Sequence, residues 1–361
     1  MAVVAASAIT LCSPASATGL HKPTPAASTQ PIVTSPQPIQ PAPVEGPELI
    51  WNLSWWGKTR PITAGSERLA GLLRNRTGGR WTLRLHYGST LAKPHKNLAA
   101  LTQGKFEAAA FCNFFHPRQN PALMALSLPF IPITDWDRNR RIRDAVYNTS
   151  AVRKEMSGHK VALYVSTYLP PFEILGKGEA PATPDDWQGM TVRAGGGIGR
   201  AMKVLRAIPS GATAAEAYTG LKQGTMQAAS FPFTYAHFDF KIHDVAAWFT
   251  SNLAPGTADC PLAFSLAAYN ALPGQYKKLL EDVRDEVATA QIQAYRAIDE
   301  KNLVIFRSKL MEVTYSDAQR DALLSAAGKP VIEAWITQHQ KSFDARALVQ
   351  KIFSTAGQTY D

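Results

Sequence analysis

The 361-residue sequence predicts an α/β protein of two similarly built lobes with a ligand cleft between them. Three observations support this prediction. Short alternating or apolar segments, typical of strands, take turns with segments of helical periodicity. An eleven-residue stretch occurs twice, and a long amphipathic helix follows its second copy. Hydrophobic residues make up 45% and charged residues 18% of the chain, which fits an ordinary globular protein.

The first 48 residues differ in composition from the rest. Ala2 to Leu11 is apolar and Ala15-Ser16-Ala17 fits a cleavage site, so residues 1–17 are expected to be a signal peptide, although its usual basic start is missing. Residues 18–48 contain eight prolines among Ser, Thr and Ala, and are expected to form a disordered linker. Whether the linker tethers the protein, and where the chain truly starts, stays open. The fold is expected to begin at Leu49.

Helix and strand signals alternate from there. Apolar spacing, strand-like alternation and capping residues each mark an element. In order, we expect a helix at Thr63–Arg76 capped by Thr77-Gly78-Gly79, a strand at Trp81–Tyr87, a helix at Asn97–Thr102, an apolar strand at Phe106–Cys112, a strand at Val161–Thr167 and a helix start at Thr183–Asp186.

The stretch Leu101–Phe111 returns as Leu221–Phe231 with six of eleven positions identical. Each copy has the pattern of a helix end, a glycine cap and a strand of small residues. Chance similarity in alanine-rich sequence is the alternative. If the repeat is real, each lobe has one such unit, and Phe111 and Phe231 end strands whose carboxyl ends face the cleft.

A long helix is expected over residues 275–310, because its apolar residues recur at helical spacing and no proline interrupts them. It is long enough to brace both lobes; a coiled-coil partner helix is the other interpretation. We expect the first lobe to comprise residues 49–165 and 255–300, and the second residues 166–254 and 301–361.

The segment around Arg193 is the best candidate for binding chemistry. It has the pattern of a short strand ending at Arg193, followed by Gly195-Gly196-Gly197 at the start of a helix. An arginine there can hold a carboxylate with two charge-assisted hydrogen bonds, and a glycine-rich helix start also favours an anion. The alternative is that Arg193 pairs with a surface acid. Arg200 stands where a dinucleotide-binding loop would need glycine.

The sequence at this point resembles a known family. The motif W-x-G-M-x-V-R-x-G-G-G at Trp187–Gly197 is similar to the DctP-type solute-binding proteins of TRAP transporters. The resemblance extends over roughly Trp51 to the C-terminus. Further matching segments are Trp81–Tyr87, Ser127–Phe130, Ile208-Pro209, Glu216–Tyr218 and Leu221–Gly224. The resemblance implies a periplasmic two-lobed protein with a bracing helix. It also implies delivery of the ligand to a TRAP membrane permease, and that Arg193 holds the ligand carboxylate.

Departures from the family pattern guide the expected ligand. Glu173 lies where members that bind larger or doubly charged acids often have a second arginine, and a carboxylate there would repel a second ligand carboxylate. Trp55 and Trp56 stand where small or amide residues are common, and Asn113 could supply an amide.

We therefore predict a monocarboxylate with an apolar or aromatic body, stacked among Trp55, Phe111, Phe172 and Phe231. For each of these aromatic residues, ordinary core packing is the alternative.

Other functional classes find little support. The net charge of +10 is scattered, which argues against nucleic-acid binding, and no apolar stretch after the N-terminus could span a membrane. No catalytic, metal or cofactor motif occurs, so we expect no enzyme activity, cofactor or metal. A ligand sensor for a membrane receptor would share this fold. Cys112 and Cys260 could pair or remain buried thiols.

Overall fold

The computed structural model of the chain describes residues 42–360. The expected signal peptide at 1–17, and the expected linker as far as residue 41, lie outside these residues. The prediction of disorder is wrong for residues 42–48, because this segment packs onto the fold. The Val44 amide donates to the Arg76 carbonyl at 2.7 Å, and the Tyr276 hydroxyl donates to the Pro47 carbonyl at 2.9 Å.

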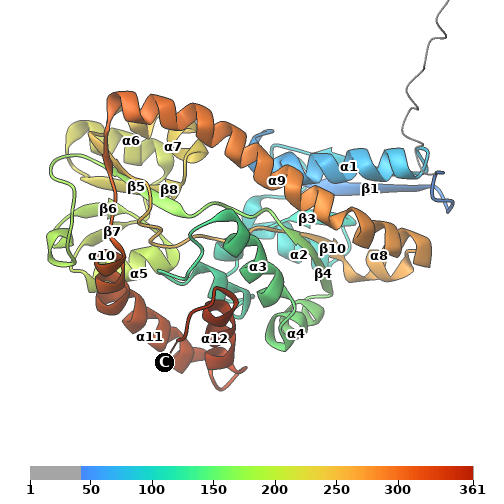
Figure 1. The fold of residues 1–361 in the computed structure, drawn as a ribbon. Helices are drawn as coiled ribbons and strands as arrows, with labels where there is room; N and C mark the ends of the chain where they lie inside the picture. Colours follow the sequence, from blue (N-terminus) through green and yellow to red (C-terminus); the bar gives the residue numbers. More distant parts are fainter. Residues whose placement is uncertain (1–41, 361) are drawn as a thin grey trace, which may run out of the picture. The chain divides into compact units, whose positions relative to one another are not determined.

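Two mixed sheets organise residues 42–360, as the sequence predicted (Figure 1). The first sheet has the order β2 (Trp81–His86), β1 (Leu49–Ser54), β3 (Ala108–Ala110), β10 (Pro261–Ser265), β4 (Val161–Ser166). The second has the order β11 (Met311–Val313), β9 (Trp248–Thr250), β5 (Phe172–Gly176), β8 (Ala228–Pro232), β6 (Thr191–Arg193), β7 (Ile208–Ser210).

Helices cover and connect the sheets. They are α1 (Ala64–Arg76), α2 (Asn97–Thr102), α3 (Trp136–Tyr147), α4 (Ser150–Gly158), α5 (Gly196–Val204), α6 (Ala214–Gln223), α7 (Tyr235–Asp239), α8 (Leu266–Ala271), α9 (Gly274–Lys309), α10 (Asp317–Leu323), α11 (Lys329–His339) and α12 (Ala345–Thr355). The helix start expected at Thr183–Asp186 gives only a short 3-10 turn, Asp185–Trp187. No helix within residues 42–360 has the length and apolar character needed to cross a bilayer.

The repeated stretch forms the same unit in both sheets. α2 leads through Gly104 into β3, and α6 leads through Gly224 into β8. Both glycines have positive φ, +67° and +77°, which a helix-ending residue with a side chain adopts only at a cost. β3 and β8 are interior strands of their sheets, so the two copies occupy equivalent places.

The 36-residue helix α9 runs past both sheets, as the orange helix in Figure 1 shows. It packs against α1 beside the first sheet and against α7 beside the second. Gln291 of α9 accepts a hydrogen bond from the Gly65 amide (3.0 Å) and donates to the Pro61 carbonyl (2.7 Å). Asp299, further along α9, accepts from the Thr234 amide at 3.0 Å. The predicted bracing helix is therefore confirmed.

Asp299 makes the brace sensitive to pH. Burial raises the pKa of its carboxyl from 3.8 to about 6. Because the folded protein holds this proton more tightly than the unfolded chain, the contribution of Asp299 to stability falls as pH rises from about 4 to about 6. Asparagine keeps the oxygen that accepts from Thr234 and removes the charge. We expect Asp299→Asn to be about 1–2 kcal/mol more stable than the wild type at pH 8.

Urea unfolding at pH 4 and pH 8 checks this expectation. The advantage of Asp299→Asn should nearly vanish at pH 4, where the wild-type carboxyl is protonated in the folded protein. Glu155 and Glu173, whose pKa values burial raises to about 7, keep their own pH dependence in both proteins and cancel in the difference. A variant less stable than the wild type at pH 8 would contradict this reading of Asp299.

The C-terminal helix departs from the expected lobe assignment. The expectation places all of residues 301–361 in the second lobe, but α12 packs against α3, which lies beside the first sheet. The reason is the apolar face of α12. Leu348 and Ile352 are buried in one cluster with Ile142 and Val146 of α3. The chain therefore returns to the first lobe at its end.

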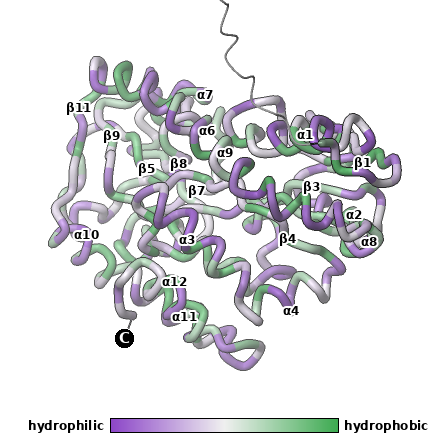
Figure 2. The backbone as a smooth tube through the Cα atoms, turned by 45° about the vertical axis from the view of Figure 1, so that its right-hand side comes forward, coloured by the Kyte–Doolittle hydropathy of each residue, from purple (hydrophilic) through white to green (hydrophobic). Residues whose placement is uncertain are grey.

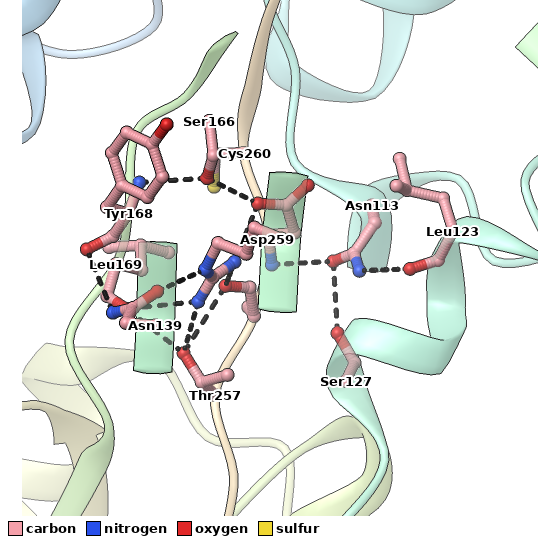
Figure 3. A network of polar contacts seen from close by, with 12 residues as sticks. Asn113, Leu123, Ser127, Asn139, Ser166, Tyr168, Leu169, Thr257, Asp259 and Cys260 are labelled. Carbon is pink, nitrogen blue, oxygen red and sulfur yellow. Dashed lines mark hydrogen bonds and ion pairs between the residues drawn. The ribbon is translucent and has the colours of Figure 1, made fainter. Parts of the chain in front are cut away.

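A buried polar network on α3 holds the two segments that connect the sheets. These connecting segments are residues 167–171, between β4 and β5, and residues 251–260, between β9 and β10. The backbone of α3 is coloured largely hydrophilic in Figure 2, yet the side chain of its Arg143 is fully buried. The Arg143 guanidinium donates to Asp259 Oδ1 (2.6 Å), Thr257 Oγ1 (3.1 Å), Asn139 Oδ1 (2.5 Å) and the carbonyls of Ala258 (2.9 Å) and Leu169 (3.0 Å). Asn139 donates to the Leu169 carbonyl as well, at 3.0 Å (Figure 3).

Cys112 and Cys260 form a disulfide across the ends of β3 and β10. The sequence left their pairing open. The antiparallel register of β3 and β10 explains the pairing. Ala110 lies opposite Leu262, so two residues further along Cys112 lies opposite Cys260.

Candidate ligand-binding site

A cavity of about 600 Å³ has walls from both lobes. The first lobe contributes Trp56, Arg60, Ile62, Cys112, Phe114, Pro117, Met124, Ser127, Thr257, Ala258 and Cys260, together with Leu169 of a connecting segment; the second contributes Phe172, Arg193, Gly195–Gly197, Ile198, Arg200, Ala214, Phe231, Pro232, Tyr235, Ala236 and Phe240. Three of these residues are arginines, and none is an aspartate or glutamate. The cavity is therefore apolar for the most part, with a positive charge suited to an anion.

Arg193 is fixed in this wall by its own lobe. It ends β6, which pairs in parallel with β8, and Arg193 Nη1 donates to the Ser230 carbonyl of β8 at 2.7 Å. Nε donates to the Ala212 carbonyl at 3.2 Å. The guanidinium carbon lies 4.0 Å from the centre of the Phe231 ring, a cation–π contact. Two backbone carbonyls and one ring thus hold the side chain in place before any ligand arrives.

The guanidinium of Arg193 has no counter-ion among residues 42–360. No ion pair within residues 42–360 includes it, so the alternative of a surface acid partner does not apply to them. Burial lowers its pKa from 12.5 to about 10, which leaves the group charged at neutral pH. Its Nη2 makes no hydrogen bond to these residues. A fixed cation with free donors is what an anionic ligand needs.

The start of α5 lies beside Arg193 in the same wall. Gly195 is its N-cap, and Gly195 to Gly197 line the cavity. A side chain at Gly197 would place Cβ 2.1 Å from the Ser127 carbonyl oxygen, so only glycine lets α5 approach the 3-10 helix Leu123–Ser127 this closely. The first amides of a helix have no partner within it and favour an anion.

The predicted aromatic residues divide into two groups. Trp56, Phe172 and Phe231 line the cavity. Trp55 and Phe111 are completely buried and do not line it, so for these two the core-packing alternative holds. Both buried residues belong to the first lobe, and in each case the next residue, Trp56 or Cys112, lines the cavity instead, because neighbouring residues of an extended chain point to opposite faces.

The predicted polar residues Asn113 and Glu173 do not line the cavity. Asn113 donates to the Leu123 carbonyl (3.2 Å) and accepts from Ser127 Oγ (3.1 Å) and the Asp259 amide (3.3 Å), as Figure 3 shows. Both the oxygen and the nitrogen of its amide therefore bond to the protein. It positions Ser127, which does line the cavity.

Glu173 is buried behind the cavity wall. It accepts from the Thr250 hydroxyl and from the amides of Leu253 (3.2 Å) and Ala254 (2.9 Å). Phe172, its neighbour on β5, takes the cavity face, so Glu173 points away from it. The prediction that Glu173 repels a second ligand carboxylate is therefore wrong for this arrangement.

Sequence reasoning missed several wall residues. Arg60, Arg200, Phe114, Tyr235 and Phe240 line the cavity but were not among the predicted site residues. A signal for Arg60 was present, because it follows β1, and the loops at the carboxyl ends of strands face the crevice in such folds. Tyr235 and Phe240 lie on and just after α7, five residues apart, and nothing in their spacing pointed to the cavity.

Two sheets with a cavity between them, joined by crossing segments and braced by one long helix, define a two-lobed solute-binding protein. Residues 54–338 match the DctP family, described as bacterial extracellular solute-binding protein, family 7, and the chain belongs to this family. It is accordingly a solute-binding protein of a transport system, not an enzyme. A comparison with curated proteins finds no match.

Solved structures with the same fold include TRAP solute-binding proteins with bound acids. One from Roseobacter denitrificans holds β-D-glucuronate (21% identity, 84% of this chain and 98% of that chain covered, TM-score 0.69). One from a marine metagenome holds 3-hydroxybenzoate (15%, 88% and 100%, 0.72). One from Rhodoferax ferrireducens T118 holds copurified benzoate (16%, 86% and 98%, 0.70).

Proposed function

We propose that the protein captures a small organic carboxylate in the periplasm and delivers it to a TRAP-type membrane permease. The observation that supports this most is Arg193, a fixed guanidinium in the wall of a 600 Å³ cavity. Residues 42–360 provide neither a counter-ion for Arg193 nor an acidic side chain in that wall. Relatives of the same fold hold glucuronate, 3-hydroxybenzoate and benzoate, and each of these ligands is a carboxylate.

The free donors of Arg193 match a carboxylate. Nε and one hydrogen of Nη1 bond to backbone carbonyls, which leaves Nη2 and the second hydrogen of Nη1. These two nitrogens form one edge of the planar guanidinium, and each can donate to one oxygen of the same carboxylate. The start of α5 beside it adds unpaired amides. A bound carboxylate would also offset the cost of burying the arginine charge.

The body of the ligand is apolar or aromatic. Trp56, Phe172 and Phe231 offer ring surfaces on the cavity wall, and a flat ligand can stack on them. The expectation of a monocarboxylate relied on Glu173 and on the aromatic residues, and Glu173 lies outside the wall. The proposed ligand therefore has a carboxylate that binds Arg193 and an aromatic or apolar body. The number of acidic groups on the ligand depends on whether Arg60 or Arg200 binds a further one.

A thermal-shift screen tests the proposal. The acids are benzoate, 3-hydroxybenzoate, glucuronate, succinate and the three benzenedicarboxylates, with benzamide as the neutral match to benzoate. A ligand that binds only the folded protein raises its melting temperature. We expect at least one aromatic acid to raise it by several degrees and benzamide to leave it unchanged. Equal shifts with benzoate and benzamide, or no shift with any acid, would refute the proposal.

A further inference from the structure

We propose that Arg60 forms a second anion-binding position in the cavity, so that the ligand has two acidic groups on a flat apolar body. This inference rests on the proposed function, with Arg193 as the first position. It reverses the expectation of a monocarboxylate. Its basis is the unpartnered Arg60 side chain and the fact that the described residues that line the cavity include no aspartate or glutamate.

The backbone of Arg60 is tightly held. Arg60 precedes the short 3-10 turn Pro61–Thr63, which follows β1 of the first sheet. Its amide donates to Thr63 Oγ1 (3.2 Å), and the Thr63 hydroxyl donates back to the Arg60 carbonyl (2.8 Å). Gln291 of α9 fixes the next residue through the Pro61 carbonyl. The arginine therefore extends into the cavity from a rigid base rather than from a mobile loop.

The Arg60 guanidinium has no protein partner in the described part of the chain. Its Nε is shielded from solvent and makes no hydrogen bond, and no carboxylate lies within 4 Å of the group. Burial raises the pKa values of Asp239 and Tyr235 on α7, and the nearby Arg60 charge offsets part of that rise, but neither side chain forms an ion pair or hydrogen bond with Arg60. Leaving a shielded donor unpaired is costly, and a ligand anion would remove that cost.

Arg200, the third arginine of the cavity, is a weaker candidate for a second anion-binding position than Arg60. It is exposed at the edge of the cavity, where it also borders an outer groove between α5 and α11, so water can solvate it. Arg60 belongs to the first lobe and Arg193 to the second. A ligand with an acidic group at each end would bind one arginine of each lobe. A ligand with a single carboxylate would leave either Arg60 or Arg193 without a partner.

Calorimetric titration with benzoate and with phthalate, isophthalate and terephthalate tests this proposal on the full chain. The three diacids place their carboxylates at different spacings, so the geometry of the site need not be known beforehand. We expect the best diacid to bind the wild type at least about ten-fold more tightly than benzoate. Arg60→Gln should weaken that diacid at least about ten-fold and benzoate less than about three-fold.

Two further variants serve as controls. Arg84→Gln removes an exposed arginine of β2 in the same lobe, and we expect it to change neither affinity. Arg60→Lys keeps the charge without the planar fork and should retain part of the diacid preference. Thermal unfolding of each variant without ligand shows whether it is folded.

Three results would overturn the second position. Benzoate could bind as tightly as every diacid, Arg60→Gln could weaken benzoate and diacid equally, or Arg84→Gln could have the same effect as Arg60→Gln. In each case the carboxylate site at Arg193 stands. If neither benzoate nor any other acid of the screen binds the wild type, the proposed function fails and this inference fails with it.

Discussion

Arg193→Ala is expected to weaken binding of the best acid from the thermal screen by about 100-fold or more, on the order of 3 kcal/mol. The variant removes both donors that face the carboxylate and leaves that carboxylate in an apolar cavity without its counter-ion. Calorimetry on the wild type and the variant measures the loss. Arg193→Lys keeps a charge but not two parallel donors, and an intermediate affinity is expected.

Arg206→Ala is the matched control for Arg193→Ala. Arg206 follows α5 in the same lobe, but it is exposed and paired with Asp185 at the surface. Its removal lowers the net charge by the same amount and should leave affinity nearly unchanged. Since Arg193 also holds the carbonyls of Ala212 and Ser230, the variant needs a check by circular dichroism. A folded Arg193→Ala protein with wild-type affinity would show that the carboxylate binds elsewhere.

Arg143→Met is expected to lower the free energy of unfolding by about 3–5 kcal/mol. Methionine has a similar length but no donors, so the fully buried Asp259 would lose its counter-ion and several carbonyls their partners. The Arg143 guanidinium also joins Leu169 to Thr257 and Ala258, three residues of the cavity wall from the two connecting segments. Urea unfolding measures the loss, and the variant should also bind acids more weakly.

Two comparisons distinguish this mechanism from a general loss of helix α3. Arg140→Met changes a partly exposed arginine on the same helix and should cost less than about 1 kcal/mol. Adding Asp259→Asn to Arg143→Met removes the uncompensated charge and should recover part of the stability. If Arg140→Met and Arg143→Met lower the free energy of unfolding by the same amount, the buried network around Arg143 does not stabilise the fold as proposed.

The layout of the fold could be predicted because its signals are local. Strand alternation at Trp81–His86, the glycine after Thr102 in the first repeat copy and the uninterrupted periodicity of residues 275–310 each depend on neighbours a few residues apart. Arg193 could be found for the same reason, since a short strand followed by three glycines marks both its strand end and the helix start beside it.

The lining of the cavity could not be predicted residue by residue. A shift of one position along an extended chain exchanges wall and core, which is why Trp56 and Phe172 line the cavity while Trp55 and Glu173 are buried behind it. Asn113 depends on Ser127 and Asp259, partners 14 and 146 residues away. Packing of α12 on α3 is equally long-range. Such contacts leave no periodic trace in the sequence.

A crystal structure with the best acid of the screen tests the carboxylate site most directly. The proposed function predicts density for the acid in the 600 Å³ cavity, with its carboxylate oxygens about 2.7–3.1 Å from Nη1 and Nη2 of Arg193. Its body should lie against Phe231 or Phe172. A carboxylate bound away from Arg193, or an acid bound outside this cavity, would contradict the proposed function.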